Sequence, residues 1–240
     1  MSNLVIIPTY NEKENVEAII QAVFAQPEPF HVLIVDDGSP DGTAQIVKSM
    51  QHQYAGQLHL LERSGKLGLG TAYIAGFNWG LAKDYEYFFE MDADFSHPPQ
   101  DLVRLLAKCR DEGADVAVGS RYVNEGSVKN WSWDRIVLSY GASLYTRILL
   151  WMPVADPTAG FICYKRKVLE TMNLGAIQFI GYAFQIEMKY TAHRLGFKVM
   201  EVGITFKDRE KGQSKMSLGI IKEAMFGVLQ MRFKKVVRNT

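Results

Sequence analysis

Cysteine and proline are both scarce in this sequence, which contains two cysteines and 8 prolines among 240 residues. Cys109 and Cys163 lie in mainly apolar segments far from any CxxC spacing. This placement favours buried, reduced thiols of a cytosolic protein over a disulfide framework or a metal site. With 48% hydrophobic and 22% charged residues, the composition excludes disordered and collagen-like chains and indicates a globular protein of one or two domains.

An excess of charge of either sign is also missing. The 27 Lys and Arg residues nearly cancel the 26 Asp and Glu residues, which leaves a formal net charge of +1. No global positive field is therefore available to hold a nucleic acid, and we expect no nucleic-acid partner.

Long uninterrupted apolar runs are absent. The first ten residues, MSNLVIIPTY, lack a basic region followed by a long apolar core, so we interpret them as a first strand and expect a cytosolic chain. Residues 136–154 approach the length of a membrane span but carry polar and charged side chains. These are Ser139, Tyr140, Ser143, Thr146 and Arg147. The segment is a poor membrane span, and we expect either a helix at an interface or a helix packed on the core.

Two common nucleotide-binding signatures are incomplete. Tyr73 occupies the third glycine position of a GxGxxG pattern after Gly68 and Gly70. The GxxxxGK(S/T) pattern of a P-loop does not occur. These departures argue against a dinucleotide-dependent dehydrogenase and against a P-loop enzyme.

The first half of the sequence alternates strand and helix patterns. Strands are predicted at 4–7, 31–35, 58–61, 87–91 and 115–119. Helices are predicted at 12–25, 43–53, 71–83 and 99–112. The alternation predicts an α/β protein with right-handed βαβ units and a mostly parallel sheet flanked by helices.

The second half is less regular. We expect a helix at 134–151, a strand at 161–164, a helix at 182–195, a strand at 199–206 and a final helix capped by Ser217. On that final helix one narrow polar stripe is predicted, formed by Glu223, Gly227, Gln230, Lys234 and Arg238. Basic residues without acidic ones follow Glu223, which suits an anionic membrane surface, a partner helix, or a core helix with a solvated basic end.

Polar loops follow three of the predicted strands. They read PTYNE (8–12), DDGSPDG (36–42) and DADFSH (92–97). Parallel sheets bind ligands at the carboxyl ends of their strands, so a site is expected there. Asp92 and Asp94 offer hard oxygen ligands of the kind that Mg²⁺ or Mn²⁺ takes together with phosphate oxygens, and a nucleotide diphosphate is the natural ligand.

Several motifs occur together in a fixed order. They are PTYNE (8–12), VDDGSPDGT (35–43), GLG (68–70), MDADFSHPP (91–99), GSRY (119–122), WSWDR (131–135), DPTAGF (156–161) and REKGQSK (209–215). This set resembles the polyprenol (dolichol) monophosphate mannose synthases, which are inverting glycosyltransferases of family two with the A-type fold. The resemblance covers nearly the whole chain and implies that fold, with amphipathic interface helices in the C-terminal half.

For the donor, the resemblance implies that Pro8, Tyr10 and Glu12 line the base pocket and that Asp37 binds the nucleoside. Asp92 and Asp94 would face the diphosphate, with Asp94 as the metal ligand for Mg²⁺ or Mn²⁺. Where some members have a Gln ligand two residues further on, this sequence has Ser96, so a hydroxyl or a water fills that place. The residues implied in catalysis are Asp94, Arg121 and Arg209, with Arg121 on the donor diphosphate.

For the acceptor, the resemblance implies that Arg135 and Ser139, four residues apart on one helical face, hold a phosphate. Lys215 would join them from a loop that also carries Arg209. We expect residues 1–120 to bind the nucleotide sugar, 121–216 to form the acceptor half of the same domain, and 217–240 to form an amphipathic helix.

The implied reaction transfers mannose from GDP-mannose to a dolichyl-type or undecaprenyl-type phosphate with inversion, giving polyprenyl phosphate mannose and GDP. A phosphate monoester with a second pKa of about 6 is already largely dianionic at neutral pH, so no general base is required. The chain would act peripherally on the cytoplasmic face of a membrane, by surface contact or through a separate membrane subunit.

Three alternatives stay open. A sister enzyme would use UDP-glucose or another nucleotide sugar with the same lipid phosphate. A polysaccharide glycosyltransferase is disfavoured because the QxxRW signature is absent, the nearest string being QMRF at 230–233. A noncatalytic nucleotide-sugar-binding subunit is disfavoured by Asp94, Arg121 and Arg135.

Overall fold

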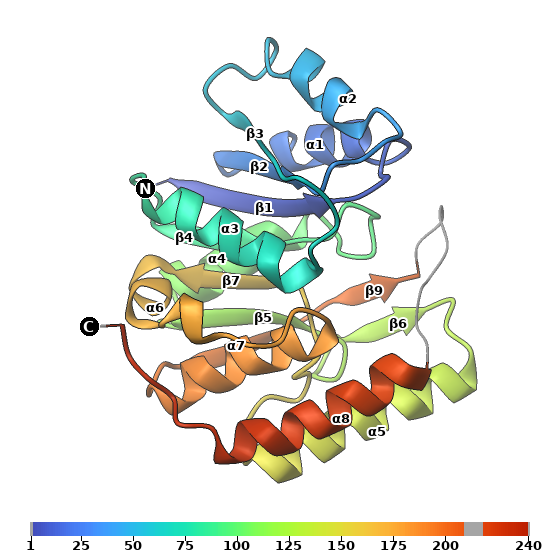
Figure 1. Ribbon diagram of the computed structural model, residues 1–240, viewed down its shortest axis with the longest axis vertical. Helices are drawn as coiled ribbons and strands as arrows, with labels where there is room; N and C mark the ends of the chain where they lie inside the picture. Colours follow the sequence, from blue (N-terminus) through green and yellow to red (C-terminus); the bar gives the residue numbers. More distant parts are fainter. Residues whose placement is uncertain (1, 209–217, 240) are drawn as a thin grey trace.

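The protein is built around one seven-stranded sheet (Figure 1). The computed structural model describes residues 2–208 and 218–239, with the backbone alone at 182 and 218–224. In spatial order the strands are β3 (Leu58–Glu62), β2 (Phe30–Asp36), β1 (Asn3–Thr9), β4 (Tyr87–Glu90), β7 (Ile162–Lys165), β5 (Val116–Ser120) and β8 (Val199–Gly203). Only β7 runs antiparallel to its neighbours β4 and β5 among these pairings. The predicted α/β class with a mostly parallel sheet is confirmed.

Helices cover both faces of the sheet, so its strands are apolar on both sides. In β1, Val5 and Ile7 pack with α1 (Val16–Phe24), α2 (Thr43–Met50) and α4 (Asp101–Arg110). Leu4 and Ile6 face the opposite layer, formed by α3 (Leu69–Leu81), α6 (Arg166–Thr171) and α7 (Tyr182–Arg194). Helix α6 and the short 3₁₀ helix η1 (Leu174–Ala176) were not predicted. Both cysteines are free and buried in the core, as expected.

The strand predicted at 199–206 is wrong in one respect, because the chain changes sheet within it. Its first part is β8, whereas β9 (Thr205–Lys207) pairs with β6 (Ser127–Lys129) in a separate two-stranded parallel sheet. Ile204 makes the transition: its N–H donates to the Ser120 carbonyl at 3.0 Å and its carbonyl accepts from the Ser127 N–H at 2.9 Å. A side chain at Gly203 would collide with the neighbouring loop, since a Cβ there would lie 2.2 Å from the Asn124 carbonyl.

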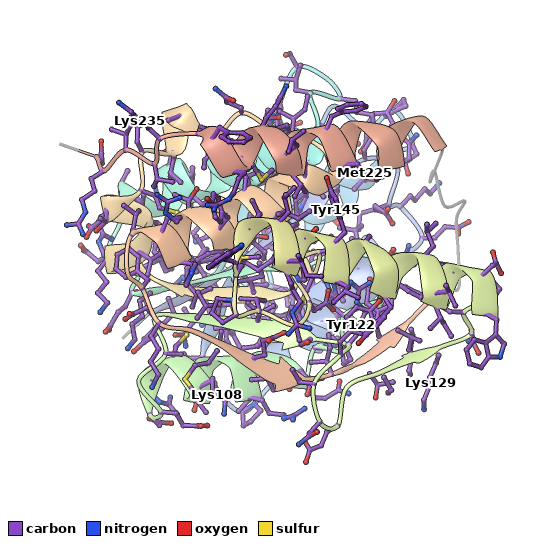
Figure 2. All side chains as sticks on the ribbon, turned by 90° about the horizontal axis from the view of Figure 1, so that it is seen from below. Lys108, Tyr122, Lys129, Tyr145, Met225 and Lys235 are labelled. Carbon is purple, nitrogen blue, oxygen red and sulfur yellow. The ribbon has the colours of Figure 1, made fainter. Side chains whose placement is uncertain are left out.

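Two long helices lie side by side at one end of the molecule (Figures 1 and 2). They are α5 (Trp133–Leu150) and α8 (Leu218–Phe233), and they meet α7 in a third apolar cluster that includes Leu150, Tyr190 and Val228. Their outward side chains include several exposed apolar groups. No helix within 2–208 or 218–239 is both long and apolar enough to cross a membrane.

The polar stripe predicted along the final helix is wrong beyond Phe233, where α8 ends. Lys234 has left the helix and its Nζ contacts the buried Glu187 carboxylate at 2.5 Å and the Ala176 carbonyl at 2.5 Å. A buried carboxylate without a counter-charge is costly, so this ion pair outweighs another turn of helix. Arg238 forms an antiparallel bridge with Met172 instead. The expected cap, Ser217, lies outside the described residues.

Candidate active site

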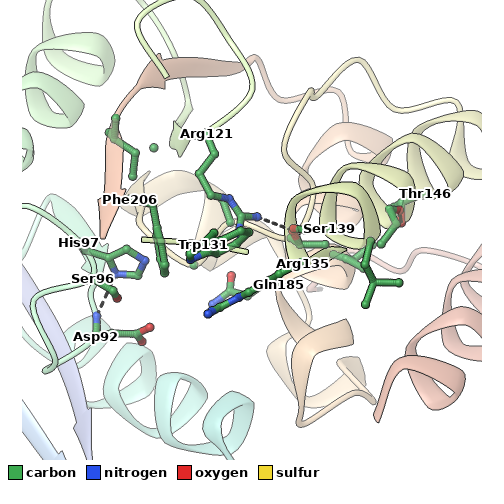
Figure 3. A pocket seen from close by; sticks show the side chains of 18 of the residues that line it. Asp92, Ser96, His97, Arg121, Trp131, Arg135, Ser139, Thr146, Gln185 and Phe206 are labelled. Atoms are coloured by element: carbon green, nitrogen blue, oxygen red, sulfur yellow. Dashed lines mark hydrogen bonds between the residues drawn. The ribbon is translucent and has the colours of Figure 1, made fainter. Parts of the chain in front are cut away.

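A cavity of about 260 Å³ opens beyond the carboxyl ends of β4 and β5 (Figure 3). One end is polar and includes Asp92, Asp94, Ser96, Arg121 and Arg135. The other end is mainly apolar and lies between α5, α7 and α8, where it is lined by Leu138, Ala142, Tyr145, Ile186, Met225 and Val228. The cavity therefore joins a carboxylate pair to a hydrophobic cleft.

The loop after β4 holds the two carboxylates in a tight turn. The Ser96 N–H donates to Asp94 Oδ1 at 3.1 Å, and the Tyr73 hydroxyl lies 3.4 Å from Asp92 Oδ1. Phe95, between Asp94 and Ser96 in the sequence, has φ = 61°, a left-handed conformation that is uncommon for a residue with a side chain. The Phe95 side chain packs against the core, which keeps the turn in this conformation.

His97 fixes the other side of the same loop. Its Nδ1 accepts a hydrogen bond from the Asp92 N–H at 3.1 Å, and its ring stacks on Phe161 with centroids 5.0 Å apart. Burial lowers the pKa of His97 to about 4, although the nearby Asp94 carboxylate acts in the opposite direction. The imidazole is therefore neutral at physiological pH, which lets Nδ1 accept from the backbone.

The oxygen atoms at this loop fit a hard divalent cation. The Asp94 side chain is largely buried, and the Ser96 Oγ is buried without a hydrogen-bond partner in the described structure. Carboxylate and hydroxyl oxygens are ligands that Mg²⁺ and Mn²⁺ accept. No cluster of three or more His, Cys, Asp or Glu side chains suited to a metal occurs in the described part of the chain. Such an ion would therefore need oxygens from water or from a ligand to complete its shell.

Arg121, at the end of β5, is held by a buried carboxylate. Its Nε donates to Asp156 Oδ2 at 2.7 Å and its Nη2 to Asp156 Oδ1 and Thr158 Oγ1, both at 2.6 Å. Burial alone would raise the pKa of Asp156, but the guanidinium outweighs it and the pKa is lowered. Burial likewise acts to lower the pKa of Arg121, and the carboxylate raises it overall. Arg121 is thus a fixed cation, and its Nη1 takes part in none of these bonds.

Arg135 lies on the first turn of α5 at the same cavity. Its Nη1 donates to Asp208 Oδ2 at 2.5 Å, and its guanidinium lies 4.2 Å from the centre of the Trp131 ring. Ser139, one turn further, accepts a hydrogen bond from the Tyr122 hydroxyl at 2.7 Å. The predicted pair Arg135 and Ser139 therefore does share one face of α5, beside the apolar cleft.

The residues predicted to bind the nucleoside lie at neighbouring strand ends and do not line this cavity. Pro8 belongs to the last part of β1, and Tyr10 lies below the Lys66 ammonium at 4.9 Å. The Glu12 carboxylate accepts from the Asn15 amide at 2.8 Å. Pro8, Tyr10 and Glu12 therefore lie at and just beyond the carboxyl end of β1, and their role in binding the nucleoside stays a prediction.

Asp37 follows β2 and is almost fully buried. Its Oδ1 lies 3.2 Å from Arg63 Nη1, and its Oδ2 accepts from the Leu67 N–H at 3.2 Å. Burial raises the pKa of Asp37, and the Arg63 charge opposes that rise. The ion pair anchors the loop after β3 to the end of β2.

Two predicted residues, Arg209 and Lys215, lie outside the described residues, and their roles stay predictions. Three further polar residues at or behind the cavity received no role from the sequence. Asp156, which holds Arg121 without lining the cavity itself, appears only within the DPTAGF segment, and the lining residue Trp131 only within WSWDR. Gln185 gave no signal at all, because a lone glutamine in a helix is unremarkable in sequence.

The mostly parallel sheet carries a carboxylate pair after β4 and a fixed arginine after β5, at the edge where open α/β sheets bind their ligands. Residues 4–172 match the family model described as Glycosyl transferase family 2. The chain belongs to that family.

Two curated relatives match almost the whole chain. A polyprenol monophosphomannose synthase from Mycolicibacterium smegmatis is 50% identical over 227 residues, covering 95% of this chain and 85% of that protein. An undecaprenyl-phosphate mannosyltransferase from Micrococcus luteus is 44% identical over 228 residues, covering 95% of this chain and 93% of that protein.

Solved structures share the fold at low sequence identity. A glucosyl-3-phosphoglycerate synthase from Mycobacterium tuberculosis, in complex with Mn²⁺, UDP-glucose and phosphoglyceric acid, has a TM-score of 0.69 at 17% identity, covering 98% of this chain and 80% of that one. A mannosyltransferase from Pyrobaculum calidifontis, in complex with GDP-mannose and Mn²⁺, has a TM-score of 0.58 at 16% identity, covering 95% and 69%. The A-type fold expected from the sequence is confirmed.

Proposed function

We propose that this protein transfers mannose from GDP-mannose to the phosphate of a polyprenyl phosphate, giving polyprenyl phosphate mannose and GDP. One observation carries the proposal: a single cavity runs from the Asp92 and Asp94 carboxylates past Arg121 and Arg135 into the apolar cleft between α5 and α8. A lipid phosphate matches this cavity, because its phosphate head suits the polar end and its hydrophobic tail suits the apolar cleft. The names of the two curated relatives support the same donor sugar and acceptor class.

On the donor side, Pro8, Tyr10 and Glu12 would contact the base and Asp37 the nucleoside. Asp94 and Ser96 would hold Mg²⁺ or Mn²⁺, whose bound charge neutralises the leaving diphosphate. Asp92 faces the same diphosphate. Arg121 adds a fixed positive charge there, because its pairing with Asp156 costs no reorganisation during the reaction.

On the acceptor side, Arg135 and Ser139 would hold the lipid phosphate. The incoming dianion competes with Asp208 for the Arg135 guanidinium, and a phosphate offers more charge and more acceptor oxygens than a carboxylate. The phosphate oxygen needs no general base. Its attack on the anomeric carbon opposite the departing GDP inverts that carbon. Residues 1–120 then form the donor half and 121–216 the acceptor half, although Arg121, at the boundary, reaches the donor diphosphate. Helix α8 lines the cleft.

The proposed cellular location is the cytoplasmic face of a membrane, reached by peripheral contact or with a separate membrane subunit. Exposed aromatic side chains on and beside α5 and α8 support this location. Trp133, Trp151 and Phe233 are 79%, 78% and 81% exposed. Tryptophan favours the membrane interface, and apolar groups on two parallel helices would dip into it beside the mouth of the cleft.

The test is a donor and acceptor panel. Purified protein with Mg²⁺ or Mn²⁺ and a polyprenyl phosphate receives GDP-mannose, UDP-glucose or UDP-N-acetylglucosamine separately, and mass spectrometry identifies the lipid product. We expect mannosyl lipid from GDP-mannose alone. If product forms only from a uridine nucleotide sugar, the proposed reaction type is right and the proposed donor sugar is wrong. If the protein binds a nucleotide sugar but forms no product, the proposed acceptor is wrong. Glu125→Gln, at a side chain that is 78% exposed, is the control variant.

A further inference from the structure

Gln185 occupies the floor of the cavity without a role in the scheme above. It lies on α7, is 4% exposed, and lines the same space as Asp92 and Arg121 (Figure 3). Its Nε2 donates to Glu90 Oε2 at 2.5 Å. Its Oε1 is buried and has no hydrogen-bond partner in the described structure. A buried acceptor of this kind is costly unless a ligand or a water satisfies it.

The orientation of the Gln185 amide follows from Glu90, the last residue of β4. Burial raises the pKa of Glu90 to about 8, and its Oε2 accepts the hydrogen bond from the amide N–H. Lys189, one turn after Gln185, donates to the Ala159 carbonyl at 2.6 Å, and Gln185 Oε1 accepts no hydrogen bond from it in the described structure. The amide N–H thus points at Glu90 and Oε1 is left for the cavity.

The position of Gln185 lies between the two charged ends of the proposed site. Its partner Glu90 is two residues before Asp92, while the neighbouring Gly160 belongs to the segment whose Thr158 holds Arg121. A Cβ on Gly160 would lie 3.5 Å from Gln185 Nε2 and 3.8 Å from His97 Cε1. The missing side chain therefore leaves room beside the amide.

The chemistry of Oε1 defines its ligand. An amide oxygen accepts hydrogen bonds and donates none, so it does not suit a phosphate or a carboxylate. The transferred hexose lies between the leaving diphosphate and the attacking phosphate, and its hydroxyls are the hydrogen-bond donors there. We propose that Gln185 is a specificity-determining residue whose Oε1 accepts a hydrogen bond from one hydroxyl of the donor hexose, with Glu90 as its positioning residue. This inference rests on the proposed function, which places a nucleotide sugar in the cavity.

The experiment measures nucleotide affinity by calorimetry with MnCl₂ and without acceptor. GDP, GDP-mannose and its 2-, 3-, 4- and 6-deoxy analogues are titrated into the wild type, Gln185→Met, Glu90→Gln and Gly160→Ala. Gln53→Met, at an exposed glutamine, is the matched control. We expect Gln185→Met to raise the ratio of the GDP-mannose Kd to the GDP Kd roughly tenfold. In the wild type, we expect one deoxy analogue to bind more weakly than GDP-mannose by the same factor. In Gln185→Met, that analogue and GDP-mannose should bind equally well.

Glu90→Gln lets the amide turn and weakens the same discrimination without changing the affinity for GDP. Gly160→Ala, which keeps both partners and adds only a methyl group, lowers the affinity for GDP-mannose and not for GDP. If Gln185→Met and Glu90→Gln fail to fold, the Gly160→Ala variant alone decides the test. A ratio unchanged within about twofold, or equal losses for GDP and every analogue, overturns the inference.

The two proposals fail separately. If the hexose discrimination depends on Gln185 but no lipid product forms, the acceptor assignment fails and the inference stands. If mannosyl lipid forms but Gln185→Met leaves the ratio of the GDP-mannose Kd to the GDP Kd unchanged, only the inference about Gln185 fails. If the wild type binds no nucleotide sugar, both are wrong.

Discussion

Arg121 and Asp156 form a buried ion pair in which each acidic oxygen of Asp156 accepts from the guanidinium at 2.6 or 2.7 Å. The Asp156 side chain is fully buried and that of Arg121 is 10% exposed. Glu201 supports the same corner, because its carboxylate accepts from the N–H groups of Ala155 and Asp156 at 2.7 and 2.9 Å. The position of the Arg121 guanidinium is thus set by a residue outside the carboxylate loop.

Replacing Asp156 by Asn should therefore affect both stability and catalysis. The change leaves the Arg121 charge buried without its partner, at a cost of about 3 kcal/mol in the free energy of unfolding. We expect kcat to fall as well, since Arg121 loses its fixed orientation. Urea unfolding and steady-state kinetics measure the two effects. Glu125→Gln removes an exposed partner of Arg104 and should cost less than about 0.5 kcal/mol. Equal costs for the two variants would contradict the structural account.

Asp94→Asn keeps the size of the side chain and removes its charge. We expect kcat to fall roughly 100-fold or more because a divalent ion at the diphosphate loses an anionic ligand. The Mn²⁺ concentration for half-maximal activity should rise at the same time. Kinetics over a Mn²⁺ titration measure both quantities, with the exposed Asp111→Asn as control. An unchanged metal dependence would show that Asp94 does not hold the ion.

Arg135→Gln should separate acceptor from donor. Loss of the cation that faces the lipid phosphate is expected to raise the KM for polyprenyl phosphate roughly tenfold or more and to leave the KM for GDP-mannose within about twofold. Initial rates with each substrate varied in turn make the comparison. Arg104→Gln removes an arginine elsewhere on the chain and should change neither constant. A rise in the GDP-mannose KM alone would place Arg135 on the donor.

Lys189 gives a pH dependence whose sign can be derived. Burial lowers its pKa to about 8, although the nearby Glu90 acts to raise it. Between pH 8 and the ordinary value of about 10.5, the unfolded chain binds more protons at this side chain than the folded chain does. The stability of the wild type relative to Lys189→Met should therefore grow as pH rises through this window. Urea unfolding of both proteins at pH 8, 9 and 10 measures the difference, and a constant or shrinking one would refute the assignment.

The exposed aromatic groups predict binding to anionic vesicles. Trp133→Ser combined with Trp151→Ser should weaken vesicle binding several-fold at low salt, since each tryptophan contributes to the interface. Leu67→Ser, which removes a side chain that is 53% exposed on another loop, should have no such effect. Co-sedimentation with vesicles measures the bound fraction. If the wild-type protein does not bind anionic vesicles, the proposed peripheral membrane location is wrong.

Much of the fold was predictable because its signals are local. Short apolar runs such as residues 4–7 and 32–35, bounded by polar loops, favour strands buried on both faces, and helical periodicity between them implies parallel pairing. The antiparallel direction of β7 and the passage of the chain between sheets at Ile204 depend on distant partners. No local pattern reports such partners.

The same distinction holds for the site. The carboxylate loop and the pair Arg135 and Ser139 are visible as short motifs with fixed spacing. Asp156 and Gln185 act through partners 35 and 95 residues away, namely Arg121 and Glu90. Their roles arise from burial, which leaves a charge or an amide oxygen without water. Likewise, the helix stripe was extended too far because the buried Glu187 that attracts Lys234 lies 47 residues away.

The most direct measurement is a crystal structure of the complex with GDP, Mn²⁺ and a short polyprenyl phosphate such as geranyl phosphate, with anomalous scattering recorded for manganese. The account predicts the manganese peak at Asp94 and Ser96, the lipid phosphate against Arg135, and the isoprenoid between α5 and α8. An isoprenoid bound elsewhere, or a manganese ion away from Asp94 with GDP bound, would contradict it.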